Sequence, residues 1–195
     1  DSLRGDANAN VLRGNLGNDV IDGRGGLDTR DESNAVVNVT INLNTTTAQT
    51  TGLGSDTITN IENVYTGSGN DTITANGADN LLNGGSGNDT YVFLDGFGSD
   101  TVVDASGDDT LDFSGVTNSL LFSFESGSTT AGYAGNLVST GTGIENYLGG
   151  SAADTFAINS SRSADLFGGA GSDSFVFADG ALLTGTIDGQ AGSDT

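Results

Sequence analysis

Aspartate residues recur at nine-residue intervals in this chain, and most of them close a glycine-rich stretch. The fullest copy is Gly84-Gly85-Ser86-Gly87-Asn88-Asp89-Thr90-Tyr91-Val92, which reads Gly-Gly-x-Gly-x-Asp-x-apolar-x. Its first six residues suit a tight turn, because glycine adopts positive φ at little steric cost and lets backbone carbonyls converge. A carboxylate beside converging carbonyls forms the all-oxygen ligand set that hard cations such as calcium prefer. The pattern therefore predicts metal binding.

The spacing also predicts how the turns combine. Calcium takes about six to eight oxygen ligands, which one turn cannot supply but two stacked turns can. If one coil consists of two nonapeptides, residues 18 apart, such as Asp71 and Asp89, lie directly above each other. The same spacing pairs Asp1 with Asp19 and Asn10 with Asp28, and the pairs with one or two extra residues are Asp89 with Asp109, Asn80 with Asp100, and Asp154 with Asp173. Further copies end at Asp56 and Asp194.

Very short strands must hold these turns in place. The last three residues of each motif carry one apolar side chain, and no stretch shows the 3.6-residue apolar period of a helix. Regular short strands also fit a β-sandwich, but the nine-residue phase favours a solenoid whose coils bury their faces only against their neighbours. Glycine-poorer stretches alternate apolar and polar residues, which predicts half-buried strands at Val37, Val39, Ile41 and Leu43, and again at Leu120, Phe122 and Phe124.

A longer repeat of about 83 or 84 residues encloses the short one. Ile61-Glu62-Asn63 recurs as Ile144-Glu145-Asn146, and residues 84–93 recur as 168–177. Residues 28–33 align with residues 109–114. The chain thus holds two and a fraction copies of a unit that combines a glycine-loop block with a glycine-poorer block.

Composition excludes several classes of protein. The 195 residues include 26 acidic and five basic side chains, for a net charge of −21. Such a chain repels itself unless cations bind, and it is unsuited to nucleic acid, whose phosphates require Lys and Arg. Without Cys or His, disulfides, thiolate sites and most general-base catalysis are excluded. No stretch approaches the roughly 18 apolar residues of a membrane span, and we expect no membrane insertion. The absence of a signal peptide and the ends of the chain predict a section of a longer protein.

These motifs resemble the RTX family, the haemolysin-type calcium-binding repeats of secreted bacterial proteins, and the resemblance covers most of the chain. Residues 52–89 look like the tandem repeats of large RTX surface proteins. The resemblance implies an all-β fold, a right-handed parallel β-roll or β-helix solenoid with calcium-binding glycine-rich turns. It also implies that motif positions one to four give backbone carbonyls to several calcium ions and that the position-six Asp gives its carboxylate.

The resemblance assigns ligands residue by residue. In the best copy they are Gly84, Gly85, Ser86, Gly87 and Asp89, and in its companion turn Thr66, Gly67, Ser68, Gly69 and Asp71. The third full turn offers Gly168, Gly169, Ala170, Gly171 and Asp173. The remaining position-six candidates are Asp1, Asn10, Asp19, Asp28, Asp56, Asn80, Asp100, Asp109, Asp154 and Asp194.

Several residues depart from the family pattern. Asn10 and Asn80 bring no charge, so weaker sites are expected there. Ala164 stands where an Asp should be, and Arg30 occupies an inward apolar position, which predicts a coil at an edge. Insertions predict nonapeptide blocks at 1–31, 67–115 and 149–195, separated by wider β-helix-like coils at 32–66 and 116–148.

Other readings of the same residues remain open. The Asp side chains can cap their own turns. Glu62 and Glu145 are extra ligands or, as we favour, face water beside an inward Ile. One reading of the tyrosines is a sugar-stacking surface formed by Tyr65, Tyr91, Tyr133 and Tyr147. We favour the other reading, in which Tyr91, Phe156 and Phe175 fill the apolar core. Paired carboxylates also serve glycoside hydrolysis, but here they repeat along the chain instead of clustering once, so we expect no enzyme active site.

The leading hypothesis is a structural calcium-binding segment of a large secreted or cell-surface bacterial protein, such as an adhesin, surface-layer protein or fibre. It would fold and rigidify on calcium outside the cell, and the resemblance implies type I secretion. The alternative is an accessory module of a type I-secreted protease, lipase or polysaccharide epimerase. A third hypothesis is that neighbouring copies stack end to end through open strand edges.

Overall fold

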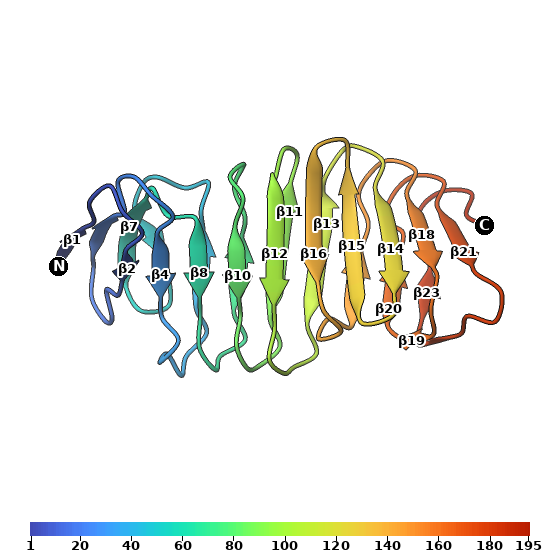
Figure 1. Cartoon of the computed structure of the whole chain (residues 1–195), viewed down its shortest axis with the longest axis horizontal. Coiled ribbons are helices and arrows are strands. Elements are labelled where there is room, and N and C mark those ends of the chain that lie inside the picture. Colours follow the sequence, from blue (N-terminus) through green and yellow to red (C-terminus); the bar gives the residue numbers. More distant parts are fainter.

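Short strands stack along one long axis, with the N-terminus at one end and the C-terminus at the other (Figure 1). The structure is a computed structural model that describes residues 1–195. It contains 23 strands and no helix, so no helix long and apolar enough to cross a membrane is present. Each strand has two to six residues, because the motif supplies only one or two inward apolar side chains before the next turn. The fold is an all-β, mostly parallel β-roll, as the sequence predicted.

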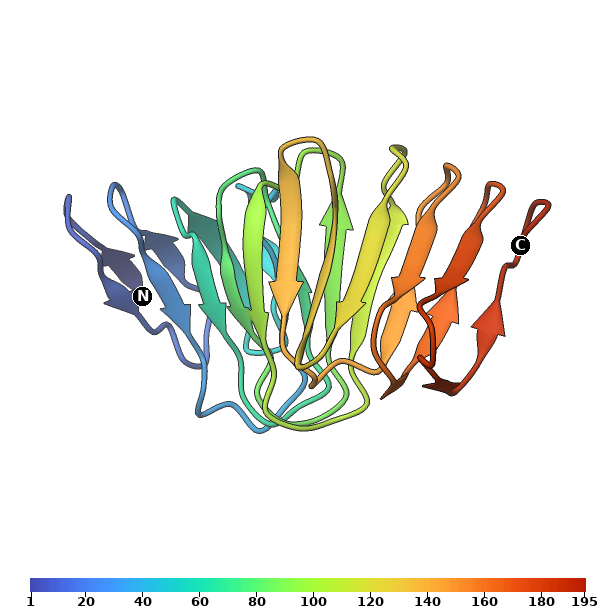
Figure 2. The ribbon, with the colours of Figure 1, turned by 45° about the vertical axis from the view of Figure 1, so that its right-hand side comes forward.

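Two faces of strands enclose the core (Figure 2). Face one consists of a four-stranded sheet in the order β1 (Ser2–Arg4), β3 (Val20–Asp22), β7 (Ser55–Thr59), β6 (Gln49–Thr50), and a seven-stranded sheet in the order β5 (Thr40–Asn42), β9 (Thr72–Thr74), β11 (Thr90–Leu94), β13 (Thr110–Gly115), β17 (Asn146–Leu148), β20 (Asp165–Phe167), β23 (Ile187–Asp188). A backbone hydrogen bond of 3.0 Å from Thr40 to Thr51 joins these two sheets.

Face two is one ten-stranded sheet. Its order is β2 (Val11–Leu12), β4 (Thr29–Asp31), β8 (Asn63–Tyr65), β10 (Leu81–Asn83), β12 (Ser99–Val103), β16 (Asn136–Thr140), β15 (Ser128–Tyr133), β14 (Leu121–Glu125), β18 (Thr155–Ile158), β21 (Ser174–Phe177). A separate two-stranded ribbon pairs β19 (Arg162–Ser163) with β22 (Leu183–Thr184). The chain alternates between the faces, so every turn lies at one of two edges of the roll.

Two insertions fold as three-stranded meanders within a face. β5, β6 and β7 form the first, on face one, where β6 pairs with β7 and the Thr40–Thr51 bond connects this hairpin to β5 in the neighbouring sheet. β14, β15 and β16 form the second, on face two, where all three are paired and Figure 1 shows them side by side. The middle strand of each runs antiparallel to its partners, β7 in the first meander and both β14 and β16 in the second. The ranges 32–66 and 116–148 therefore accommodate their extra residues by widening one face.

The long repeat changes face from one copy to the next. Residues 28–33 include β4 on face two, whereas the aligned residues 109–114 include β13 on face one. Between β4 and β13 the chain crosses the roll seven times, if each meander counts as one passage. Because seven is odd, each copy of the unit is turned over relative to the copy before it.

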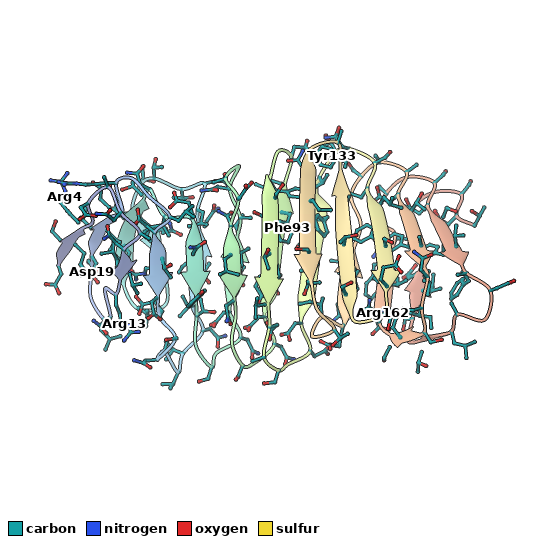
Figure 3. All side chains as sticks on the ribbon, in the orientation of Figure 1. Arg4, Arg13, Asp19, Phe93, Tyr133 and Arg162 are labelled. Atoms are coloured by element: carbon teal, nitrogen blue, oxygen red, sulfur yellow. The ribbon has the colours of Figure 1, made fainter.

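The core is a continuous apolar column between the faces, with 28 buried apolar residues. Aromatic rings stack along it, with centroids 4.8 Å apart for Phe93 and Phe113 and 4.3 Å apart for Phe122 and Phe156; Figure 3 labels Phe93 midway along the axis. Such pairs add roughly 0.5–1.5 kcal/mol beyond their area burial. The core reading of the aromatic residues is correct for Tyr91 and Phe156, which are fully buried, and the partly buried Phe175 stacks on Phe156 at the C-terminal end.

Two local predictions need revision. Val39, Ile41 and Leu43 are buried as predicted, but Val37 is 44% exposed because the regular strand begins only at Thr40. The prediction that Arg30 marks an edge is wrong. Its side chain lies fully buried between the faces, where Glu32 and Asp56 balance its charge.

Candidate metal centre

The predicted ligands lie in two rows of turns, one along each edge of the roll. The first turn row leads into face one and contains Asp1, Asp19, Asp56, Asp71, Asp89 and Asp109, with the turn residues 66–69 and 84–87. Its turns come from face two, except that the turn before Asp56 joins β6 to β7 within face one. The second turn row leads from face one into face two and contains Asn10, Asp28, Asn80, Asp100, Asp154, Asp173 and Asp194, with residues 168–171. The sequence could not divide the candidates in this way, because the meanders decide which edge each turn reaches.

Within each row the position-six carboxylates form a ladder. Asp71 N donates to Asp89 Oδ1 at 2.7 Å, and Asp89 N donates to Asp109 Oδ1 at 2.8 Å. These partners are 18 and 20 residues apart, as the stacking argument predicted. The same bond, at 2.8–2.9 Å, joins Asn10 to Asp28, Asn80 to Asp100, Asp154 to Asp173, Asp173 to Asp194 and Asp19 to Asp56. The Asp1 amine donates to Asp19 Oδ1 in the same way.

The second carboxylate oxygen is the atom that remains available. The Oδ2 atoms of six position-six residues are buried and have no hydrogen-bond partner; they are Asp19, Asp28, Asp89, Asp100, Asp109 and Asp173. A buried, unpaired carboxylate oxygen is costly, and a cation is the partner that removes the cost. Capping of the same turn accounts only for Asp71 and Asp154, whose Oδ2 atoms accept from Gly67 N at 3.2 Å and Gly150 N at 2.6 Å.

Backbone carbonyls of one turn lie close against the glycines of the next turn. Gly85 and Gly87 have φ of 99° and 119°. A Cβ at these positions would lie 2.2 Å from Gly67 O and 2.0 Å from Gly69 O. Only glycine fits, because it allows both the positive φ and the close approach. A Cβ at Gly84 would meet Asp89 Oδ2 at 2.1 Å, so the free oxygen points into its own turn.

The buried carboxylates in the turns also favour binding of a cation. Burial raises the pKa of Asp89 to about 6 and the pKa values of Asp100 and Asp109 to about 7, because the charged carboxylate has lost its water. Neighbouring carboxylates add to the shift at Asp89 and Asp109, with Asp71 the first of them for Asp89 and Asp104 for Asp109. A bound dication would reverse this effect by favouring the charged form. The donor set, made only of oxygens, fits a hard cation such as calcium.

One carboxylate at this site was not predicted from the sequence. Asp104 offers an oxygen that lies within 4.8 Å of oxygens from Asp89 and Asp109, all three mutually within that distance. Asp104 also accepts two hydrogen bonds, from the Tyr91 hydroxyl to Oδ2 at 2.5 Å and from Ser106 N to Oδ1 at 3.1 Å. Asp104 stands five residues before Asp109, where the motif normally has glycine. An aspartate at this glycine position was the feature of the sequence that could have identified Asp104 as a further candidate ligand.

Ile61 and Ile144 are buried as predicted, but Glu62 and Glu145 are only partly exposed to water, because each carboxylate accepts a backbone hydrogen bond. Glu62 Oε2 accepts from Asp28 N at 2.9 Å, and Glu145 Oε2 accepts from Asp109 N at 3.0 Å. Each glutamate thus takes the place of a position-six Asp in the ladder. In the first turn row the carboxylates end after Glu145, because the next residue in register is the buried Ala164.

The two asparagines behave differently from the aspartates. Asn80 Oδ1 accepts from Asn76 N at 3.1 Å, and its Nδ2 donates to Asn76 Oδ1 at 3.2 Å. Asn10 makes the matching pair of bonds with Asp6, at 2.7 and 3.4 Å. Both amides satisfy their own turns and leave no buried oxygen free.

Two known protein families match parts of this chain. The family of the RTX calcium-binding nonapeptide repeat (4 copies) matches residues 1–29 and 59–91. The chain is an RTX repeat protein. RTX nonapeptide repeats bind calcium, so calcium is the cation that this chain binds. The family of the peptidase M10 serralysin C-terminal region matches residues 100–184, in which the second meander lies. Both matched regions are non-catalytic. A search of curated proteins finds no match.

Proposed function

We propose that this RTX segment is a calcium-folded β-roll module of a type I-secreted extracellular enzyme. The observation that carries the proposal is the pair of turn rows lined with buried, unpartnered carboxylate oxygens. The serralysin C-terminal match supports attachment to an enzyme. RTX repeats and this C-terminal region are typical of proteins exported by type I secretion.

Calcium in this proposal binds between successive turns of each row. Asp89 and Asp109 supply carboxylate oxygens, and the Gly87 carbonyl, which a Cβ at Gly107 would meet at 1.8 Å, supplies a neutral ligand between the same two turns. Asp104 adds a third carboxylate at that level. Two or three carboxylates balance the double charge of one ion, and each ion joins two coils that the strands alone connect through only a few hydrogen bonds.

Folding of the module then depends on the calcium concentration. At a net charge of −21 the metal-free roll buries unpaired carboxylates at both edges, so metal-binding free energy becomes folding free energy. Extracellular calcium modules bind with dissociation constants of about 0.1–1 mM. The segment would stay unfolded inside the cell, where calcium is scarce, and fold once it is outside. The module itself carries out no catalysis.

A second candidate is a structural segment of a surface adhesin or fibre. It is favoured by the long repeat, since both units contain the same meander and a module attached to an enzyme needs only a few nonapeptides. In that case copies could also stack end to end through open strand edges. Light scattering in millimolar calcium tests the stacking, and a monodisperse monomer contradicts it.

Far-UV circular dichroism with calcium, magnesium or chelator tests the primary proposal. We expect strand signal in calcium only, because magnesium demands a smaller, octahedral site and gives up its waters reluctantly. Equal folding and equal stability in excess chelator would contradict the proposal. The flanking sequence separates the two candidates, since a His-containing catalytic domain supports the enzyme and further long repeats support the adhesin.

A further inference from the structure

One turn carries the calcium pattern but holds a different cation. Residues 51–56 read Thr-Gly-Leu-Gly-Ser-Asp, close to the Thr-Gly-Ser-Gly-Asn-Asp of residues 66–71. Asp56 Oδ1 accepts from Asp19 N at 2.9 Å, as in every other step of the ladder. Its Oδ2, however, lies 3.0 Å from Arg30 Nη2 and accepts from Thr51 Oγ1 at 2.8 Å. The oxygen that stays free at six other aspartates is occupied here.

The guanidinium reaches this turn through the core. Arg30 belongs to β4 on face two, and its side chain crosses to Asp56 in β7 on face one, near the N-terminal end where Figure 3 labels Asp19. Arg30, Asp56 and Thr51 are all fully buried. Arg30 Nη2 also lies 3.0 Å from Glu32 Oε1. A guanidinium keeps its charge at any ordinary pH, so it is a permanent counter-ion for these two carboxylates.

The second long unit provides an internal comparison. Leu111, Phe113 and Val138 occupy the positions of the second unit that are equivalent to Arg30, Glu32 and Asp56 in the first. All three are buried and apolar. The charged groups have thus been replaced together, which identifies them as one unit. Where the cation is absent, both carboxylates are absent too, although the surrounding meander is the same.

We propose that Arg30 is a built-in cation that takes the place of calcium at Asp56, so that turn 51–56 has the pattern of a calcium site but binds no metal. The first meander is then held to the nonapeptide block before it by an internal ion pair. Calcium is confined to the turns whose carboxylate oxygens have no protein partner.

Anomalous scattering from crystals of the wild-type chain grown in calcium or terbium tests this directly. We expect metal peaks at about 2.3–2.6 Å, the usual calcium–oxygen distance, from Asp89 and none at that distance from Asp56. A peak on the Asp56 carboxylate overturns the proposal. Absence of metal from both residues also overturns it, because Asp56 would then not differ from the other turns.

Calcium counts by native mass spectrometry provide a second test. Asp56→Asn should bind as many ions as the wild type, whereas Asp89→Asn, the matched control, should bind at least one fewer. If Asp56→Asn does not fold, the graft R30L/E32F/D56V introduces the three residues of the second unit and should also keep the wild-type count. Loss of an ion in either Asp56 variant, with the fold retained, refutes the replacement of calcium by Arg30.

Discussion

Replacing Asp89 with Asn is the sharpest test of the ligand assignment. Asparagine keeps the size of the side chain and can still accept the 2.7 Å bond from Asp71 N through Oδ1. The change removes only the charge and the free Oδ2, which is buried and unpartnered in the wild type. The strands and the core are left untouched, so any effect that depends on calcium arises at the metal site.

The expected magnitude follows from mass action. An ion that binds only the folded state stabilises it by RT ln(1 + [Ca²⁺]/Kd). With dissociation constants of about 0.1–1 mM, one site contributes about 1.4–2.7 kcal/mol at roughly 10 mM calcium. Asp89→Asn should therefore lower the free energy of unfolding by about this amount. The slope of stability against calcium should fall by about 1.4 kcal/mol per tenfold change in concentration for each ion lost.

Urea unfolding at pH 7.5 over a series of calcium concentrations measures both quantities. The matched control is Asp179→Asn, which removes the same charge from an exposed side chain and should change stability by less than about 0.5 kcal/mol with an unchanged slope. If Asp89→Asn gives the wild-type slope against calcium, Asp89 is not a ligand and the assignment built on its free oxygen is wrong.

Three further predictions test the turns. Gly84→Ala should raise the calcium midpoint of folding in a dichroism titration, because the new Cβ would meet Asp89 Oδ2 at 2.1 Å; Gly141→Ala, where nothing lies within 4 Å, is the control and should leave the midpoint unchanged. Calcium affinity measured by calorimetry should fall from pH 7.5 to pH 5, because burial raises the pKa values of Asp89, Asp100 and Asp109 to about 6–7 and protons then compete with the ion; an affinity that does not depend on pH would contradict these shifts. For the same reason the metal-free roll is most stable below about pH 4 and loses stability as the pH rises through 6–7. Asn80→Asp should lower the calcium midpoint by adding a carboxylate beside Asp100, whereas Asn159→Asp, an exposed change outside both turn rows, should not.

Periodicity in the sequence specified the parts of the structure that depend on local geometry. The nine-residue motif determines where the chain turns, since glycine permits the φ values of 99° and 119° at Gly85 and Gly87. Two motifs make one coil, so the 18-residue pairing of Asp71 with Asp89 followed from counting. The apolar residue after each motif is inward, because side chains alternate along a strand. The ladder and its ligand candidates were therefore visible without coordinates.

Glutamates 62 and 145 and Arg30 show what counting could not reach. Asp28 and Asp109, which donate to the glutamates, and Asp56, which accepts from Arg30, lie 26 to 36 residues away from them. They come into contact only because a meander is folded between them. A glutamate that follows an inward Ile reads as solvent-facing, and an arginine at an inward position reads as an edge. Both readings fail because a neighbouring coil supplies a backbone N–H to each glutamate and a carboxylate to the arginine.

The sequence by itself thus determined the all-β coil, the glycine turns, the candidate oxygen ligands and the need for cations, because all of these arise within one or two motifs. Tertiary structure alone decided which of the two edges each carboxylate joins, since seven crossings turn each long unit over relative to the one before it. It also decided which oxygens stay free for calcium. Asp56 and Asp89 end nearly the same motif, and only the packing of Arg30 through the core distinguishes them.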